Sequence, residues 1–341
     1  MHSRRSWLQA AALLPFVGAP PTQREGPPQR VLVLGGTQFV GRHFVVAALA
    51  RGHTVTMFNR GRTNPHLFPE VTRIFGDRQG DHSELRHRTW DVVVDTSGVE
   101  PDQVQRAAEV LAGSVGRYIF TSSSAAYAAG PEPFDEDHPL RTMPTSGPVG
   151  YGEKKARGEQ WVAEHHPAHI IVRPAVLVGP YDTRHRFVHY PLRAREGGEF
   201  IAPGDPELPA PLADARDLAA WLVRMIERGA TGTFNIAGPP PTMGALIAAA
   251  RRYGDGAPVW VDAEWLYERK ILFDSLPSMH RSGYHRMTST RAEAEGLRFR
   301  SVAQSMADTV AWWDAQANKP ALKGMARMRE QELLATWRAR G

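Results

Sequence analysis

The sequence predicts an α/β protein with a doubly wound parallel sheet, followed by a smaller C-terminal α/β region. From residue 30 onward, short apolar runs rich in β-branched residues alternate with amphipathic stretches of helical length. A glycine-rich segment separates the first run from the first helical stretch. The 341 residues suit one large domain or two fused ones, and a composition of 42% hydrophobic and 23% charged residues indicates a folded, globular chain.

The first expected strand covers residues 30–34 (RVLVL), because an apolar run without alternation suits a strand buried on both faces. A glycine turn (GGTQFVG, 35–41) and an amphipathic stretch to residue 51 follow it. Such a turn lets the backbone approach a pyrophosphate at the helix N-terminus, which predicts a Rossmann-type dinucleotide site. An α/β fold that binds no dinucleotide is the alternative. The residues expected to contact the cofactor here are Gly35, Thr37, Gln38, Phe39, Val40 and Gly41.

The second expected strand, residues 53–58, ends at Asn59, about 20 residues past the turn, where a group facing the adenosine ribose belongs. Asn59 is not an acid, and Arg60 and Arg62 follow it. Without a carboxylate to repel a 2′-phosphate, the segment favours NADP as the cofactor, with NAD as the alternative.

Further strands are expected at 72–75, 91–94, 118–120 and 170–172, with helices near 101–113 and 151–165. Additional helices are expected from Asp214 to Glu227, over 302–315 and over 325–340. We therefore divide the chain into a dinucleotide-binding domain at 30–180 and a region at 181–341 that is mainly substrate-binding and, toward its end, helical.

Several short motifs follow the expected strands at regular places along this α/β pattern. They are Gly76-Asp77-Arg78, the run from Phe120 to Ser124 (FTSSS), Tyr151 to Lys155 (YGEKK), Arg173-Pro174 and Gly179-Pro180. Together with the glycine turn they resemble the extended short-chain dehydrogenase/reductase superfamily, the NAD-dependent epimerase/dehydratase family, from Arg30 to about Gly238. The resemblance implies an NAD(P)-dependent oxidoreductase or isomerase that acts on a secondary alcohol or ketone of a sugar-like substrate, with Asp77 in the cofactor site.

A tyrosine and a lysine lie four residues apart at 151 and 155, so a helix places them on one face. A free tyrosine, with a pKa of about 10, is a poor base, and a nearby ammonium group is expected to lower that pKa. Only five of the 41 basic residues are lysines, which argues against a chance pairing. By resemblance, Tyr151 is the general base or acid, Lys155 also holds the nicotinamide ribose, and Ser123 hydrogen-bonds the reacting oxygen. Ser122 or Ser124 could replace Ser123.

Two departures from the family pattern qualify this expectation. Gln38 occupies the middle of the turn, where the family usually has glycine, although a similar turn occurs in the chloroplast stem-loop RNA-binding branch. A non-catalytic binding protein on the same fold, RNA binders included, is therefore the alternative function. Ser124 and Ala125 stand where sugar dehydratases have an Asp-Glu pair, so dehydration by that arrangement is disfavoured.

The sequence contains fewer motifs that indicate which residues bind the substrate. By resemblance, the segments around 183–189 and 214–217 line the substrate cleft, which makes Arg184, Arg186 and Arg216 candidates to hold an anionic or polyhydroxyl ligand. Surface salt bridges are the alternative role for these arginines. The absence of cysteine excludes disulfides and cysteine-based metal sites, and no set of His, Asp and Glu is spaced to complete a metal site, so no metal is expected.

The N-terminus predicts export. Residues 3–9 (SRRSWLQ) precede an apolar stretch at 10–17 and a spacer to residue 29, a pattern that resembles a twin-arginine signal peptide. We expect a periplasmic or extracellular protein, or a cytoplasmic one if Arg4 and Arg5 are not used. Outside the cytoplasm no nicotinamide pool exists, so the cofactor is expected to stay bound and to be recycled within one turnover.

Composition also limits the partners of the chain. No apolar run reaches the roughly 18 residues that cross a bilayer. The net charge of +5 is spread along the chain, so nucleic acid is not indicated as a partner. A homodimer is possible by resemblance, because dimerisation through two helices per subunit is usual in the superfamily.

Overall fold

The computed structural model describes residues 24–271, 276 and 286–340. Seven parallel strands form the central sheet in the order β10-β6-β5-β4-β1-β2-β3. Their bounds are β1 Arg30–Leu34, β2 Thr54–Asn59, β3 Thr72–Phe75, β4 Trp90–Asp95, β5 Val115–Thr121, β6 His169–Pro174 and β10 Gly232–Ile236. The strand order runs outward from β1 in both directions, which is the doubly wound arrangement that the sequence predicted.

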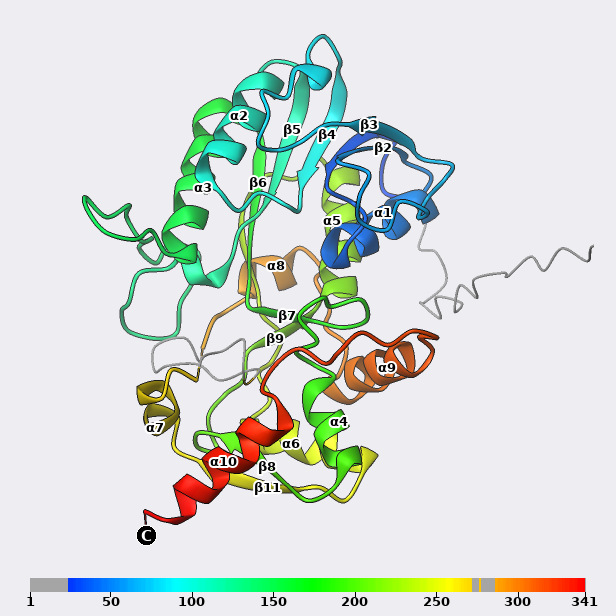
Figure 1. The fold of residues 1–341 in the computed structure, drawn as a ribbon. Helices are drawn as coiled ribbons and strands as arrows, with labels where there is room; N and C mark the ends of the chain where they lie inside the picture. Colours follow the sequence, from blue (N-terminus) through cyan, green and yellow to red (C-terminus); the bar gives the residue numbers. More distant parts are fainter. Residues whose placement is uncertain (1–23, 272–275, 277–285, 341) are drawn as a thin grey trace, which may run out of the picture.

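Helices cover both faces of this sheet (Figure 1). The helices α1 (Phe39–Ala50) and α5 (Ala215–Glu227) pack with Val31 and Val33 of β1, while α2 (Pro101–Leu111) and α3 (Tyr151–His165) pack on the other face. Leu32 and Leu34 of β1 point to that second face. Because successive side chains of a strand alternate between faces, a strand buried on both sides reads as an unbroken apolar run.

A smaller part of the molecule lies beyond the carboxyl ends of the central strands (Figure 1). It contains two short parallel pairs, β7 (Val176–Val178) with β9 (Leu212–Asp214) and β8 (Glu199–Pro203) with β11 (Ala257–Val261). The remaining α-helices are α4 His189–Glu196, α6 Met243–Ala250, α7 Ala263–Glu268, α8 Thr290–Ala294, α9 Val302–Asp314 and α10 Arg327–Arg338. Single 3-10 turns occur at Ser83–Leu85, Ser124–Ala126 and Arg251–Tyr253.

The central sheet confirms the predicted fold class, and each of the six strands expected in it is present within a few residues. The sequence did not predict the edge strand β10, which returns to β6 from the second half of the chain. The division at residue 180 stays a prediction, and the structure adds that β10 and α5 pack with the first half.

The export signal and spacer are expected at residues 1–29, of which 1–23 lie outside the described residues. In the remaining part, residues 24–29, Glu25 lies against α5, where its carboxylate pairs with Arg224 and Arg228. None of the helices in the described ranges is both long and apolar enough to cross a bilayer.

Candidate active site

The glycine turn between β1 and α1 is tightly closed. Gly35 and Gly36 have positive φ angles of 112° and 94°, a conformation that residues with a Cβ atom rarely adopt. A Cβ atom at Gly41 would lie 2.8 Å from both the Gly36 amide nitrogen and the Thr96 Oγ1 atom. The third glycine therefore lets α1 pack directly on the turn, as a dinucleotide-binding turn requires.

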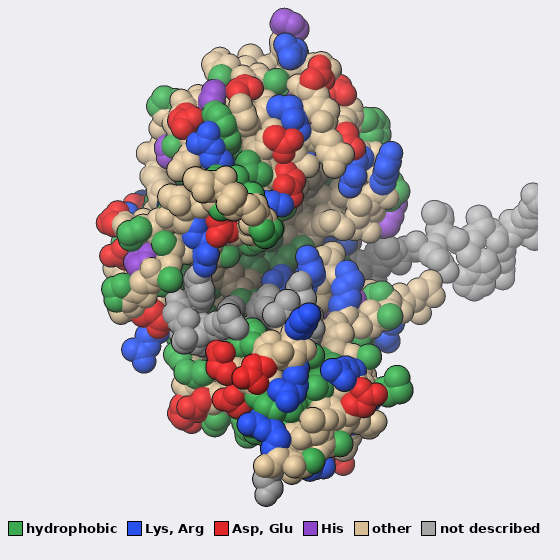
Figure 2. All heavy atoms as spheres, turned by 60° about the vertical axis from the view of Figure 1, so that its left-hand side comes forward, with side chains coloured by type: hydrophobic (Ala, Val, Ile, Leu, Met, Phe, Trp, Pro, Cys, Tyr) green, Lys and Arg blue, Asp and Glu red, His purple; other side chains and the backbone are tan. Residues whose placement is uncertain are grey.

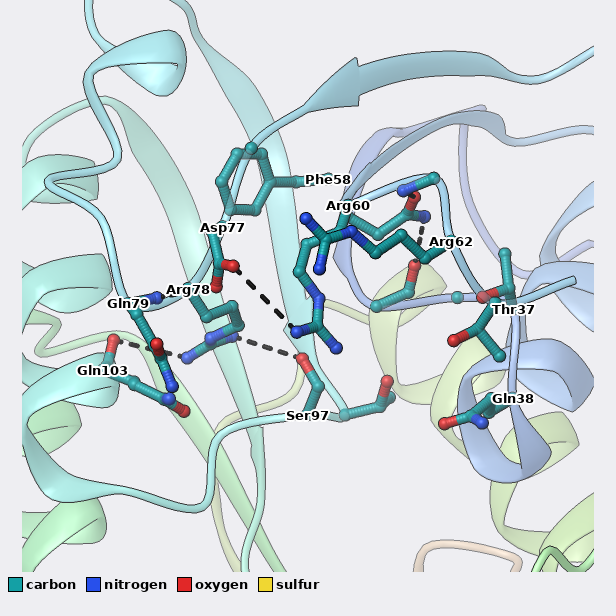
Figure 3. A pocket seen from close by; sticks show the side chains of 17 residues that line it. Thr37, Gln38, Phe58, Arg60, Arg62, Asp77, Arg78, Gln79, Ser97 and Gln103 are labelled. Carbon is teal, nitrogen blue, oxygen red and sulfur yellow. Dashed lines mark hydrogen bonds and ion pairs between the residues drawn. The ribbon is translucent and has the colours of Figure 1, made fainter. Parts of the chain in front are cut away.

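A cavity of about 350 Å³ opens beside this turn, at the carboxyl ends of β1 to β4 (Figure 3). Of the predicted cofactor residues, those that line it are Gly35, Thr37, Gln38, Asn59, Arg60, Arg62 and Asp77. Phe39, Val40 and Gly41 are absent from the lining because they form the first turn of α1, and Lys155 lies outside it on α3. The sequence prediction missed Gly36, Phe58, Gly61, Thr63, Gly76, Arg78, Gln79, Thr96, Ser97 and Gln103.

Gln38 does not close the cavity. Its side chain is exposed at the start of α1 and makes no capping hydrogen bond there. Figure 3 places it across the cavity from Asp77 and Gln79. The departure from glycine at this position therefore leaves space for a ligand beside the turn.

Asn59 joins the loops that follow β1 and β2. They border the end of the cavity where the adenosine ribose is expected, which we call the ribose end. The Nδ2 atom of Asn59 donates to the Gly35 carbonyl at 2.9 Å, and its Oδ1 atom accepts from the Gly61 amide at 3.0 Å. The neighbouring Arg60 pairs with Asp77 at 4.0 Å, and both side chains are about half exposed. Residues 59–62 thus present two guanidinium groups and no carboxylate to the cavity.

Tyr151 and Lys155 lie on the first turns of α3, near the ends of β4 and β5. Tyr151 is half exposed, whereas Lys155 is buried with its Nζ atom 6.0 Å from the centre of the Tyr151 ring. The ammonium group donates to the carbonyl oxygens of Gly98 and Thr121, both at 2.6 Å. The lysine is therefore fixed beneath the tyrosine by two backbone acceptors.

The pKa of Tyr151 shifts against the predicted direction, and the pKa of Lys155 is shifted as well. Burial raises the pKa of Tyr151 above its usual value, against the opposing effects of a hydrogen bond with Ser123 and of the charges on Arg186 and Arg184. Burial also lowers the pKa of Lys155 to about 8, although Asp95 and Glu159 act to raise it. The predicted lowering of the Tyr151 pKa is wrong, because the effect of burial outweighs that of the neighbouring charges.

The three serines after β5 have different surroundings. Ser122 is buried and donates to Glu159 on α3, so its hydroxyl is engaged away from the tyrosine. Ser123 lies close enough to Tyr151 to lower the pKa of its phenol, and the Ser123 Oγ atom accepts from the Ala125 amide at 3.2 Å. Ser124 begins the short 3-10 turn. Of the three alternatives, Ser123 is the one that the structure brings to Tyr151.

A buried ion pair anchors α3 to the sheet beneath these residues. Arg173 of β6 donates to both carboxylate oxygens of Glu159, at 3.1 and 2.7 Å, and to the Tyr127 hydroxyl at 3.1 Å. Glu159 is one helical turn beyond Lys155. The Arg173–Glu159 pair therefore fixes the position of α3, and with it Tyr151 and Lys155, along the edge of the sheet.

The three substrate candidates do not lie together. The charges of Arg184 and Arg186 act on Tyr151, and Asp182 orders their segment by accepting from both backbone amides at 3.0 Å. Arg216 instead pairs with Asp214 at 2.7 Å and with Asp308 of α9 at 2.6 Å, which makes it a link between α5 and α9. Figure 2 shows a hollow between the two parts of the molecule, with Lys and Arg side chains along its rim.

The loop after β4 connects the cavity with the catalytic candidates. Thr96 and Ser97 line the cavity, and the next residue, Gly98, holds the Lys155 ammonium through its carbonyl oxygen. The same loop thus borders the cavity and contacts the ammonium of Lys155. This arrangement, with glycines that allow close backbone approach, suits an elongated dinucleotide.

Two curated proteins with similar sequences are, by name, a chloroplast stem-loop binding protein and a reductase. The chain is 25% identical over 235 residues to the chloroplast stem-loop binding protein of 41 kDa b from Arabidopsis thaliana, covering 62% of this chain but only 59% of that protein. It is 27% identical over 247 residues to dTDP-4-dehydro-6-deoxy-D-allose reductase from Streptomyces bikiniensis, covering 61% of this chain and 76% of the reductase.

Solved structures with the same fold include enzymes that contain NAD. Bordetella bronchiseptica WbmG in complex with NAD superposes with a TM-score of 0.68 at 18% identity, covering 85% of this chain and 95% of that one. UDP-glucose 4-epimerase from Thermus thermophilus, also with NAD, gives 0.65 at 18% identity, covering 84% and 100%. Since the family model matches residues 31–237, more than half of the chain, the protein belongs to the NAD dependent epimerase/dehydratase family.

Proposed function

We propose that this protein is an NAD(P)-dependent oxidoreductase or epimerase that acts on a secondary alcohol or ketone of a sugar-like substrate. One observation carries the proposal: a single loop, residues 96–98, borders the glycine-turn cavity and also holds the ammonium of Lys155 below Tyr151. Family membership supports the same reading, and so does the reductase among the relatives.

Each catalytic candidate has a definable task in such a reaction. Tyr151 takes the hydroxyl proton while the carbonyl forms and returns it when the alcohol is remade, and Ser123 hydrogen-bonds the reacting oxygen. Lys155 supplies a positive charge beneath the phenol, which favours the phenolate at the moment of proton transfer. A bound nicotinamide ring would accept and return the hydride. Lys155 and the residues of the turn would hold this cofactor.

The proposed nucleotide is NADP, with NAD as the alternative. Arg60 and Arg62 border the ribose end of the cavity, and Asn59 brings no carboxylate there. Guanidinium groups bind phosphate through charge-assisted hydrogen bonds, whereas an acid in this place would repel a 2′-phosphate. NAD is kept as the alternative because Asp77 already pairs with Arg60 and because NAD is bound in several structures of the same fold.

We also propose that the chain is exported and therefore recycles its cofactor within one turnover. The twin-arginine-like start at Arg4 and Arg5 motivates this proposal. Residues 1–29 placed ahead of a reporter protein should direct it out of the cytoplasm, and the R4K/R5K variant should retain it inside. Equal distribution of the two fusions would contradict the export proposal without affecting the catalytic one.

The catalytic proposal is tested by incubating the full chain with free sugars and glycosides in deuterated water and following them by NMR. A new epimer without carbon-bound deuterium indicates return of the same hydride, whereas deuterium on carbon indicates proton abstraction or elimination. Tyr151→Phe should abolish either conversion. Undiminished conversion by Y151F, or no conversion by the wild type, would contradict the proposal.

RNA binding is the second candidate, and the stem-loop binding relative favours it. An RNA binder would show affinity for a hairpin RNA that falls steeply as salt rises, because phosphate contacts release counterions. Titration of a labelled hairpin at two salt concentrations measures this, and salt-dependent binding in the absence of turnover would replace the enzymatic proposal.

A further inference from the structure

A fully buried carboxylate lies under the loop that connects the cavity with Lys155. Asp95, the last residue of β4, accepts from both terminal nitrogens of Arg78 at 2.8 Å and from the Tyr118 hydroxyl at 3.0 Å. It also accepts from the backbone amides of Ser97 at 3.0 Å and Gly98 at 2.8 Å. Five donors thus satisfy one carboxylate, which fixes both the ion pair and the loop.

Gly98 links Asp95 to Lys155 through its two backbone groups. Its amide donates to Asp95, and its carbonyl oxygen accepts from the Lys155 ammonium at 2.6 Å. A Cβ atom at this position would lie 2.8 Å from Asp95 Oδ2, so a larger residue would separate the loop from the carboxylate. Only one residue stands between the buried acid and the lysine.

Several charges surround the Lys155 ammonium. Asp95 from β4 and Glu159 from α3 raise its pKa, while Arg78 from the loop after β3 and burial lower it. The phenol of Tyr151 lies on the same helix, with its ring centre 6.0 Å away. The adjacent Lys154 is paired elsewhere, with Glu100 at 2.9 Å. The Asp95–Arg78 pair therefore contributes one charge of each sign next to the catalytic lysine.

We propose that Asp95 is a positioning residue for Lys155, and that Arg78 is its partner from the wall of the cofactor cavity. Asp95 holds Gly98 in place as an acceptor for the ammonium and keeps a negative charge beside it. Arg78 lines the cavity and also reaches the Ser97 hydroxyl at 3.5 Å. The catalytic consequence rests on the proposed function, whereas the effect on Lys155 itself does not.

Titration of Lys155 provides a readout that is independent of turnover. With only five lysines in the chain, selective ¹³C labelling of lysine gives few NMR signals, and Lys155→Met assigns the one of interest. Asp95→Asn should lower the Lys155 pKa and Arg78→Met should raise it, each by about one unit or more, because the two variants remove charges of opposite sign. A role in structural integrity alone would not move the pKa in opposite directions.

A buried ion pair in the smaller part of the molecule supplies the matched control. Glu330 of α10 is fully buried, pairs with Arg193 at 3.1 Å and accepts from the Ile201 amide at 3.0 Å. Glu330→Gln and D95N should both lower the melting temperature, but Glu330→Gln should leave the Lys155 titration unchanged. This variant separates loss of a buried charge in general from loss of the charge beside Lys155.

The outcomes are distinct. Opposite pKa shifts in D95N and R78M support the proposal, and unchanged or parallel shifts overturn it. If D95N does not fold, R78M alone decides, since a Lys155 pKa that does not rise contradicts the proposal. Where turnover is measurable, D95N should lose about tenfold or more in kcat with a smaller change in cofactor affinity. If the wild type shows no turnover but D95N and R78M shift the Lys155 pKa in opposite directions, the proposed function fails while the inference about Lys155 holds.

Discussion

The two ends of the proposed cofactor site differ in burial and in hydrogen bonding. At the catalytic end, Lys155 is only 4% exposed and its ammonium has two backbone acceptors at 2.6 Å. At the ribose end, the Arg60 and Asp77 side chains are 54% and 45% exposed and approach only to 4.0 Å. One end is a set of buried, hydrogen-bonded charges, and the other is a loose surface ion pair.

This difference matches the demands of the two ends. Proton transfer requires donors and acceptors at fixed positions, which buried hydrogen-bonded groups provide. Binding of a phosphate requires positive charge that can adjust to the ligand, and an exposed ion pair worth about 0–1 kcal/mol is easily exchanged for a phosphate contact. Changes at the catalytic end should therefore affect kcat, and changes at the ribose end should affect the choice of nucleotide.

The largest effect is expected from Lys155→Met, which removes the buried ammonium. Turnover should fall by about a hundredfold to ten-thousandfold, the usual contribution of an acid–base group, as measured by initial rates. Lys154→Met is the matched control, because Lys154 pairs with the partly exposed Glu100 and should matter little. Equal losses in the two variants would remove the distinction between the two neighbouring lysines.

A second test concerns the closed glycine turn. Gly41→Ala adds a Cβ atom that would lie 2.8 Å from the Gly36 nitrogen, and overpacking of this kind costs roughly 1–3 kcal/mol. We expect nucleotide affinity to fall by about tenfold, measured by calorimetry. Gly113→Ala, in open space at φ +71°, should reduce thermal stability slightly and leave affinity unchanged. An unaffected G41A would mean that the turn does not touch the ligand.

A smaller effect is expected from the two arginines of the ribose end. Arg60→Ala and Arg62→Ala should each weaken NADP binding by about fivefold to tenfold, since one exposed charged contact is lost, and should leave NAD binding nearly unchanged. Dissociation constants for both nucleotides measure the ratio. If both variants weaken NAD and NADP alike, neither guanidinium group selects for a 2′-phosphate, and the proposed preference for NADP fails.

The pH dependence gives the smallest and most specific effect. Because Lys155 has a pKa of about 8, turnover that needs its ammonium should decline as the pH rises through that value. Stability should change in the opposite direction. The folded pKa lies below the unfolded value of about 10.4, so the unfolded chain binds more protons between these two values and the Lys155 contribution to stability rises with pH there. Denaturant unfolding of the wild type and K155M at several pH values isolates this contribution, and a difference between the two proteins that is independent of pH would contradict it.

The central sheet was predictable because its signals are local. The run from Arg30 to Leu34 is apolar at four of its five positions, and the glycine turn stands directly after it, so neither inference required distant residues. The i,i+4 spacing of Tyr151 and Lys155 is equally local. By contrast, β10 pairs with β6 across some sixty residues, and its sequence, GTFNI, contains no pattern that assigns it to an edge of this sheet.

The rest of the site depends on contacts between distant segments. Arg78 meets Asp95 only because the ends of β3 and β4 lie at the same edge of the sheet, and neither residue alone indicates a buried ion pair. Arg216 is held by Asp308, 92 residues further along the chain, which spacing cannot reveal. The direction of the Tyr151 pKa shift depends on burial, and burial of a partly exposed side chain is not encoded in its local sequence.

The most direct test of the proposed chemistry is the identity of any nucleotide carried by the purified full-length chain. After gel filtration the protein is denatured and the released small molecules are measured by absorbance and mass spectrometry. We predict NADP or NAD at close to one molecule per chain, retained equally by Y151F. A protein that releases no nicotinamide nucleotide, and that binds neither NAD nor NADP in calorimetry, would contradict the claim that Tyr151 and Lys155 face a nicotinamide ring.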